Sequence, residues 1–84
     1  MKTIKLDYPV LHQGEEIREL KMRRCKVRDR RLAEKSGKDD DEKEIALISN
    51  LCEVSRDVID ELDFSDYLKL QETLSGFLSL KSVS

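Results

Sequence analysis

Residues 3–22 read TIKLDYPVLHQGEEIRELKM, and this stretch decides the fold class. The apolar side chains of Ile4, Leu6 and Tyr8 alternate with polar ones, which is the period of a strand with one buried face. Gly14 lies in a polar segment that is typical of a turn, and a second apolar-polar run follows it. A strand, a glycine turn and a second strand predict a β-hairpin.

The hairpin is expected to span about residues 3–24. Pro9 ends the first strand or places it at an edge, because proline has no N–H for a ladder. Ile17 is out of step with the later apolar residues of the second strand, and a bulge near Arg18 would reconcile them. A lone hairpin is unstable in water, so helices must cover its apolar face.

The rest of the chain predicts three or four helices, at about residues 27–36, 41–54, 56–62 and 64–80. In the first of them, Val27, Leu32 and the stem of Arg31 are expected to touch the sheet. Gly37 is a plausible residue just beyond its C-terminus. The acidic run at residues 39–44 suits the start of the next helix, where the helix dipole favours anions.

Apolar residues at a spacing of three and four run through the middle of the chain, including Ile45, Ile48 and Leu51. They continue in phase to Leu62, so one long helix is conceivable. We prefer a break at Ser55, which offers an N-cap for a short helix.

The last helix begins after Asp63, its expected N-cap, and Asp66 resembles the second residue of a capping box. Residues 81–84 are expected to fray. The prediction is therefore an α+β fold in a single small domain, residues 1–80.

The composition favours a small domain that depends on a partner for part of its stability. The chain has 84 residues, of which 40% are charged and 38% hydrophobic, with a net charge of −2. A chain of this length buries only a modest core. Neither an apolar leader nor a membrane-length apolar run is visible, so we expect a cytoplasmic protein.

No constellation of catalytic or metal-ligating residues stands out, so we expect no enzyme, no cofactor and no metal. The one histidine, His12, has no evident carboxylate partner. The two cysteines, Cys25 and Cys52, are expected to be reduced thiols. Cationic neighbours could depress the pKa of Cys25, whereas Cys52 lies on an apolar helical stripe.

The stretch KMRRCKVRDRR, residues 21–31, is strongly basic. It could mark a nucleic-acid-binding protein, or it could be a solvated surface whose alkyl stems cover a small core. The stretch contains no aromatic residue and crosses from a strand into a helix. Its cations should therefore point several ways, and some should pair with the acidic run at residues 39–44.

The apolar arc of the last helix covers about half of its circumference, which is wider than one buried contact requires. The arc could be core, or it could contact a partner. Both readings stay open at this point.

Several motifs in order make the chain similar to the small tail assembly chaperones of contractile-tailed bacteriophages and prophages. The motifs are IKLDYPV at 4–10, LKMR at 20–23, EIALISNLCEVS at 44–55, LDFSDY at 62–67 and GFL at 76–78. Asp29 matches an Asp of the family pattern, whereas Cys25 stands where proline is common.

The resemblance implies a non-enzymatic chaperone that binds the tape measure protein and assists tail tube assembly in the host cytoplasm, and that is absent from the mature virion. It implies further partners in the tail tube protein and a longer form of the chain made by frameshifting. A homo-oligomer stays open, and a phage regulator that binds nucleic acid through residues 21–31 is the alternative. We take as candidate partner-binding residues Arg23, Tyr67, Leu70, Leu74, Phe77 and Leu78.

Overall fold

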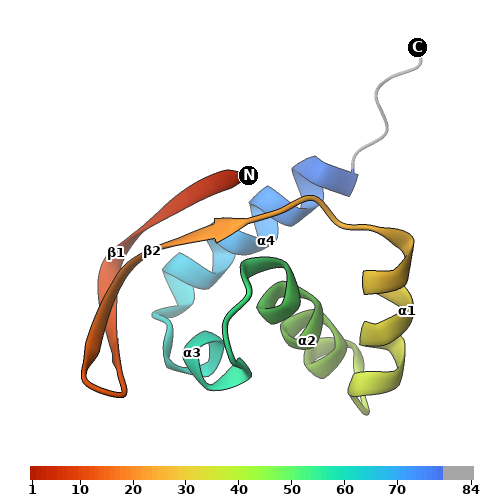
Figure 1. The fold of residues 1–84 in the computed structure, drawn as a ribbon, viewed down its shortest axis with the longest axis horizontal. Helices are drawn as coiled ribbons and strands as arrows, with labels where there is room; N and C mark the ends of the chain where they lie inside the picture. The colour runs from red at the N-terminus through yellow and green to blue at the C-terminus, as the bar shows by residue number, and fades with distance from the viewer. Residues whose placement is uncertain (79–84) are drawn as a thin grey trace.

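The computed structural model describes residues 1–78 and shows a two-stranded hairpin followed by four helices within that range (Figure 1). The α+β prediction is therefore confirmed. None of the helices in this range is long and apolar enough to cross a membrane. The elements are β1 (Lys2–His12), β2 (Glu15–Met22), α1 (Val27–Ser36), α2 (Asp40–Cys52), α3 (Arg56–Glu61) and α4 (Phe64–Leu78).

The two strands are antiparallel and meet at a two-residue turn. Gln13 and Gly14 both have positive φ, at 51° and 81°. Two consecutive residues of positive φ make the turn whose twist matches the flanking strands. Glycine tolerates this conformation without steric cost, which explains why the turn falls at Gly14.

The pairing of the strands is interrupted in the middle of the hairpin. Lys5 pairs with Glu19 and Val10 pairs with Ile17, so residues 6–9 of β1 lie opposite the single residue 18 of β2. The irregularity therefore falls at the expected place, but its extra residues belong to β1.

This irregularity changes which side chains face the core. Leu6 and Val10 are buried, whereas Tyr8 is exposed, so the prediction that Tyr8 shares the buried face is wrong. Tyr8 lies in the irregular segment, where the strand does not keep the regular alternation, and the buried phase of Leu6 resumes at Val10. Pro9 fits there because the interrupted ladder needs no N–H from it.

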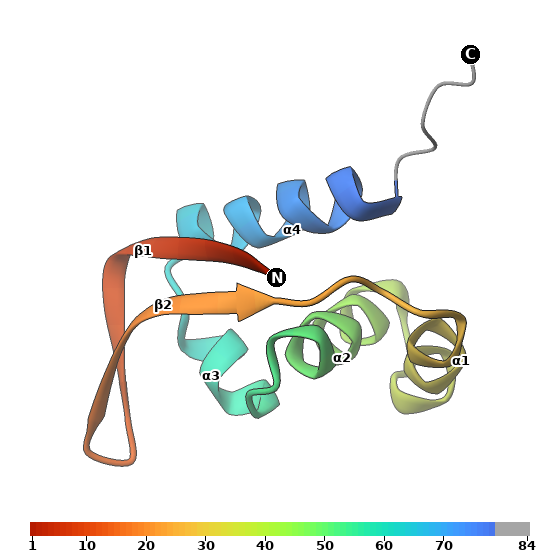
Figure 2. The same ribbon diagram turned by 45° about the horizontal axis from the view of Figure 1, so that its top comes forward.

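The helices cover one face of the hairpin and enclose a single core. Helix α4 packs against β1 and α2 packs against β2, while α1 packs against α2 at the far end from the hairpin turn (Figures 1 and 2). The buried apolar cluster is built from Ile4, Leu6, Val10, Leu20, Met22, Ala33, Leu47, Ile48, Leu51, Cys52, Ile59, Leu70 and Leu74.

Helix α1 does not present the expected side chains to the core. Val27 is 79% exposed and Leu32 is 53% exposed, and Arg31 is exposed as well. The buried residues of α1 are Asp29 and Ala33. The prediction was wrong because α1 packs on α2 rather than on the sheet, and the small side chain of Ala33 allows that close approach.

Gly37 acts through close approach and not as a left-handed helix cap. Its φ is −141°, which any residue adopts. A Cβ atom added there would lie 2.7 Å from the backbone nitrogen of Lys43, in the second turn of α2. Real Cβ atoms do not approach a backbone atom so closely, so the turn between α1 and α2 requires glycine.

The predicted break between α2 and α3 is confirmed. Glu53 adopts a left-handed conformation with φ 57°, and its backbone N–H donates to the carbonyl oxygen of Asn50. Ser55 occupies the N-cap position of α3, although its side chain makes no capping hydrogen bond. At the start of α2, the Asp39 carboxylate accepts the backbone N–H of Glu42 at 2.9 Å.

Candidate functional site

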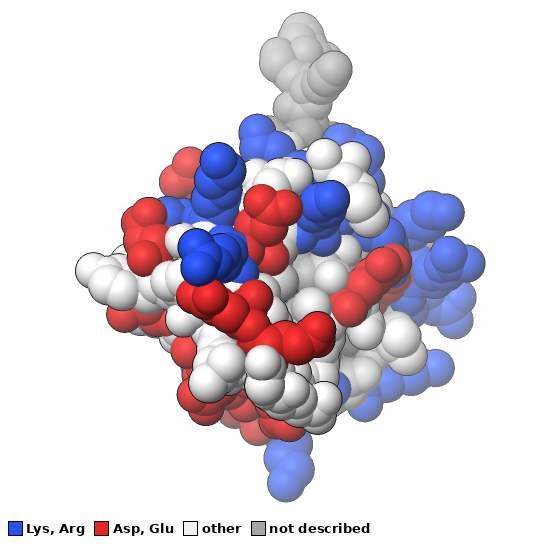
Figure 3. Space-filling model, turned by 60° about the vertical axis from the view of Figure 1, so that its left-hand side comes forward, with Lys and Arg blue, Asp and Glu red and all other residues white. Residues whose placement is uncertain are grey.

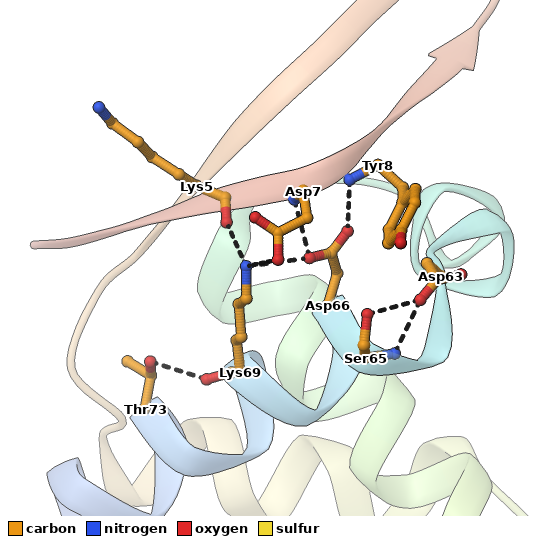
Figure 4. Close-up of polar contacts among 8 residues, drawn as sticks. All are labelled: Lys5, Asp7, Tyr8, Asp63, Ser65, Asp66, Lys69 and Thr73. Atoms are coloured by element: carbon orange, nitrogen blue, oxygen red, sulfur yellow. Dashed lines mark hydrogen bonds and ion pairs between the residues drawn. The ribbon is translucent and has the colours of Figure 1, made fainter.

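The residues that open α4 anchor this helix to the hairpin (Figure 4). Asp63 caps the helix, because its carboxylate accepts the backbone N–H of Ser65 at 3.1 Å and the Ser65 hydroxyl at 2.6 Å. The predicted N-cap is thus confirmed. Asp66 does not complete a capping box, and its side chain points to β1 instead.

The Asp66 carboxylate binds the irregular segment of β1. It accepts the backbone N–H of Asp7 at 2.9 Å and that of Tyr8 at 3.0 Å. The Lys69 ammonium lies 3.2 Å from Asp66 and 2.9 Å from the Asp7 carboxylate, and it donates to the carbonyl oxygen of Lys5. These bonds fix the orientation of α4 about its own axis and so determine which side chains it exposes.

The environment of Asp66 keeps its carboxylate charged. The side chain is fully buried, which by itself raises the pKa. The two backbone N–H groups and Lys69 act in the opposite direction, and the net effect is a lowered pKa. Asp66 is therefore an anion that joins helix to strand, and no sequence pattern near it indicates the strand it contacts.

A second, partly buried ion pair forms the corner between β2 and α1. The two terminal N–H groups of the Arg23 guanidinium donate hydrogen bonds to the Asp29 carboxylate, with N–O distances of 2.8 and 2.9 Å. The same carboxylate accepts the backbone N–H of Lys26 at 2.8 Å, at the N-terminus of α1. The hydrogen bonds from Arg23 lower the pKa of Asp29 to about 2.

The side of α4 that borders the groove toward α2 carries a stripe of side chains spaced four, three, four and three residues apart. This outer stripe consists of Phe64, Leu68, Gln71, Ser75 and Leu78. Its apolar members are Phe64, which is 69% exposed, Leu68, which is 46% exposed, and Leu78, which is 53% exposed. The 4-3 spacing is the one by which helices pack side by side over several turns.

The six candidate residues do not form one surface. Leu70 and Leu74 are buried in the core, on the side of α4 that faces the hairpin and α2. Leu78 is exposed on the outer stripe. Sequence periodicity could not separate these leucines, because core and outer stripe are adjacent on the same helix.

The other three candidates are partly buried, and each is engaged within the chain. Arg23 is held by Asp29. Phe77 lies under the guanidinium of Arg24, with 5.4 Å between the guanidinium carbon and the ring centroid. The Tyr67 hydroxyl donates to Glu44 at 2.6 Å, and its ring stacks on Phe64 with 6.3 Å between centroids.

A groove with an apolar floor separates the start of α4 from α2 and α3. Its main hollow encloses about 400 Å³. Beyond Glu44 and Gln71 it adjoins a second hollow that reaches Leu78. The main hollow is lined by Asp41, Glu44, Ile45, Ile59, Asp60, Leu62, Phe64, Tyr67 and Gln71.

Glu44 fixes the wall of this groove. One of its carboxylate oxygens accepts both the Tyr67 hydroxyl and the Gln71 amide, each at 2.6 Å. Burial, together with this bond to an anion, raises the pKa of Tyr67. The groove is therefore preformed, and Asp41 and Asp60 are exposed at its rim.

The thiols are not activated. Burial, with a further contribution from Asp29, raises the pKa of Cys25, so the expectation that its cationic neighbours depress it is wrong. Burial raises the pKa of Cys52 to about 11. Among residues 1–78, no group of three His, Cys, Asp or Glu side chains is placed to hold a metal ion.

The cations of the basic stretch point in several directions, as the sequence predicts. Arg23 binds Asp29, Arg24 stacks on Phe77, and Arg30 pairs with Glu34 at 3.2 Å. We expected some of these cations to pair with the acidic run at residues 39–44, but within the described part of the chain none of them does. On the face shown in Figure 3, both signs of charge are interspersed, with a group of Lys and Arg side chains at one edge.

The structure thus defines a small α+β protein whose last helix exposes apolar side chains. A family model described as phage tail assembly chaperone proteins, E, or 41 or 14, matches residues 3–79. No curated protein and no solved structure matches the chain. Because the family model spans nearly the whole chain, the protein belongs to the phage tail assembly chaperone family.

Proposed function

We propose that this chaperone binds helical segments of the tape measure protein through the outer stripe of α4 and assists assembly of the tail tube. The observation that carries the proposal is the pair of leucines, Leu68 and Leu78, exposed on one face of a helix whose orientation Asp66 fixes. Membership of the family supports the role in tail assembly.

The stripe suits reversible contact with many similar helices. Its 4-3 spacing matches the packing of one helix along another, and its ends are apolar while Gln71 and Ser75 in the middle are polar. A stripe of this kind gives moderate apolar contact without a shaped pocket. That suits a protein that holds a long helical client and later releases it.

The proposal places the protein in the cytoplasm of the bacterial host and outside the mature virion, and it assigns no catalytic role. The tail tube protein and a longer, frameshifted form of the chain are further proposed partners. We favour tail assembly over the nucleic-acid alternative, because the family model supports it and the arginines at residues 23, 24 and 30 are engaged within the chain.

Co-purification tests the proposal. Tagged wild-type chain and the double variant Leu68→Gln with Leu78→Gln are each expressed with the tape measure protein. Because Leu68 and Leu78 expose only about half of their surface, removing each contact costs ~1 kcal/mol and lowers the affinity roughly 5-fold per residue. We therefore expect the double variant to lose the tape measure protein.

The control is Leu11→Gln, which changes a leucine on the hairpin, away from α4, that is 72% exposed and so even more accessible than Leu68 and Leu78. The control should retain the tape measure protein, and circular dichroism should show the same helix content in all three chains. Retention by the folded double variant would contradict the proposal.

A further inference from the structure

The groove beside α4 consists of two hollows that meet at Glu44 and Gln71. On α4, Phe64 lines the main hollow and Leu78 lines the second, and each of them lies seven residues from Gln71. The two hollows therefore follow each other along the helix at a spacing of about two turns, roughly 10 Å.

Both hollows have apolar walls, and the outer stripe borders both of them. Ile45, Ile59 and Leu62 line the main hollow, and Leu74 and Leu78 line the second. Where the hollows meet, the lining is polar. Apolar, polar and apolar zones thus succeed one another along one continuous surface.

The charged residues that line the two hollows are all acidic, namely Asp41, Glu44 and Asp60. In the described part of the chain none of these three forms an ion pair. Arg56 lies beside Asp60 in an adjoining depression, but its guanidinium donates to the carbonyl oxygen of Ser36. The groove therefore offers carboxylates that no Lys or Arg of residues 1–78 pairs with.

Glu44 lies at the junction of the hollows and has one oxygen free. Its Oε1 accepts both the Tyr67 hydroxyl and the Gln71 amide. Its Oε2 accepts no hydrogen bond within residues 1–78, and no buried side-chain oxygen in that range lacks a partner, so Oε2 is accessible. A cation from another molecule can therefore bind Oε2 without displacing either internal hydrogen bond.

We propose that this groove selects client helices that carry two large apolar side chains seven residues apart, with a Lys or Arg midway between them. Residues at this spacing lie on one face of a helix, so the apolar side chains fill the two hollows while the cation binds Oε2 of Glu44. Asp41 and Asp60 favour further cations at the main hollow. The inference rests on the proposed function and adds the class of client segment that the chaperone binds.

The arrangement discriminates by repulsion as well as by attraction. A client helix with Asp or Glu midway would bring a second carboxylate against Glu44 between apolar walls, which is unfavourable. A client helix with Leu or Ile midway would cover Oε2 and deprive the carboxylate of water without giving it a partner. A cation at this position avoids both costs.

Three synthetic peptides of about 20 residues, long enough to form helices, test the proposal. The first carries two Leu seven residues apart with Lys midway. The second has the same composition with that Lys moved to the opposite face, and the third has Glu midway. By fluorescence anisotropy with the wild-type chain, the first should bind about 5-fold more tightly than the second, and the third should bind most weakly.

Glu44→Gln removes the charge and keeps an oxygen that accepts from Tyr67 and Gln71. This variant should bind the first and second peptides equally. The control is Glu72→Gln, which removes an exposed charge of α4 outside both hollows and should retain the preference. Circular dichroism checks the fold of both variants. The comparison on the wild-type chain needs no variant and decides the matter if Glu44→Gln does not fold.

Equal affinities of the wild-type chain for the first and second peptides overturn the proposal, as does a failure to bind the first. A preference that survives in folded Glu44→Gln overturns it too. If the peptides show no preference and Glu44→Gln changes the sedimentation of the chain alone, the groove binds a second copy and the proposal falls. Co-purification of the tape measure protein in any of these cases leaves the proposed function standing.

Discussion

The Asp66 carboxylate accepts the backbone N–H of Asp7 at 2.9 Å, across 59 residues of sequence. This contact replaces the strand partner that β1 lacks where its pairing with β2 is interrupted. A buried N–H without a partner is costly, so the irregular strand and the helix depend on each other. The position of α4, and hence of its outer stripe, follows from this dependence.

Asp66→Asn should destabilise the protein by about 1–3 kcal/mol, because the amide offers one acceptor where the carboxylate has two and leaves a buried donor unpaired. Equilibrium unfolding in urea measures the loss. Glu72→Gln removes an exposed charge from the same helix and should change stability by less than about 0.5 kcal/mol. Equal losses in the two variants would show that Asp66 does not anchor β1.

The Arg23–Asp29 pair makes the free energy of unfolding depend on pH in the acidic range. The pKa of Asp29 is lowered to about 2, below its value in an unfolded chain. Its contribution is therefore present above about pH 4 and is lost as the pH falls toward 2, and it amounts to roughly 2 kcal/mol. We expect the free energy of unfolding to fall less steeply between pH 4 and pH 2 in Asp29→Asn than in the wild-type chain.

That comparison has its own control. Asp66, whose pKa is also lowered, is present in both chains and adds the same downward slope to each. The difference between the wild-type chain and Asp29→Asn therefore isolates Asp29. Parallel pH profiles would contradict its assignment as a charged, hydrogen-bonded anchor of α1.

Substitutions of the buried and the exposed leucines of α4 should differ sharply in how much they destabilise the protein. Leu70→Ala and Leu74→Ala each remove a buried side chain from the core and should cost about 2–5 kcal/mol. Leu78→Ala changes an exposed residue on the same helix and should cost less than about 0.5 kcal/mol. Thermal unfolding followed by circular dichroism measures all three, and a large loss for Leu78→Ala would place it in the core.

Local patterns predict the elements of this fold well. The alternation before Tyr8, the turn at Gly14 and the N-cap at Ser55 each depend on a few neighbouring residues. The exposure of Tyr8 could not be predicted in this way, because it follows from a pairing irregularity in the middle of the hairpin.

The candidate site was harder to predict for the same reason. The outer stripe and the core leucines share one helix, and its orientation depends on contacts far apart in sequence, such as the bonds from Asp66 and Lys69 to β1. On α1, the exposed Val27 and the buried Asp29 reverse the usual order of hydrophobicity. Asp29 is buried because Arg23 and the backbone of Lys26 satisfy its charge.

The most direct measurement of the central claim is the fraction of tape measure protein that stays in the supernatant when the two proteins are co-expressed. With the wild-type chain we expect most of it to stay soluble. With Leu68→Gln and Leu78→Gln combined, we expect it to aggregate, while the folded variant itself remains soluble. A tape measure protein that stays equally soluble with the double variant would contradict the assignment of the outer stripe.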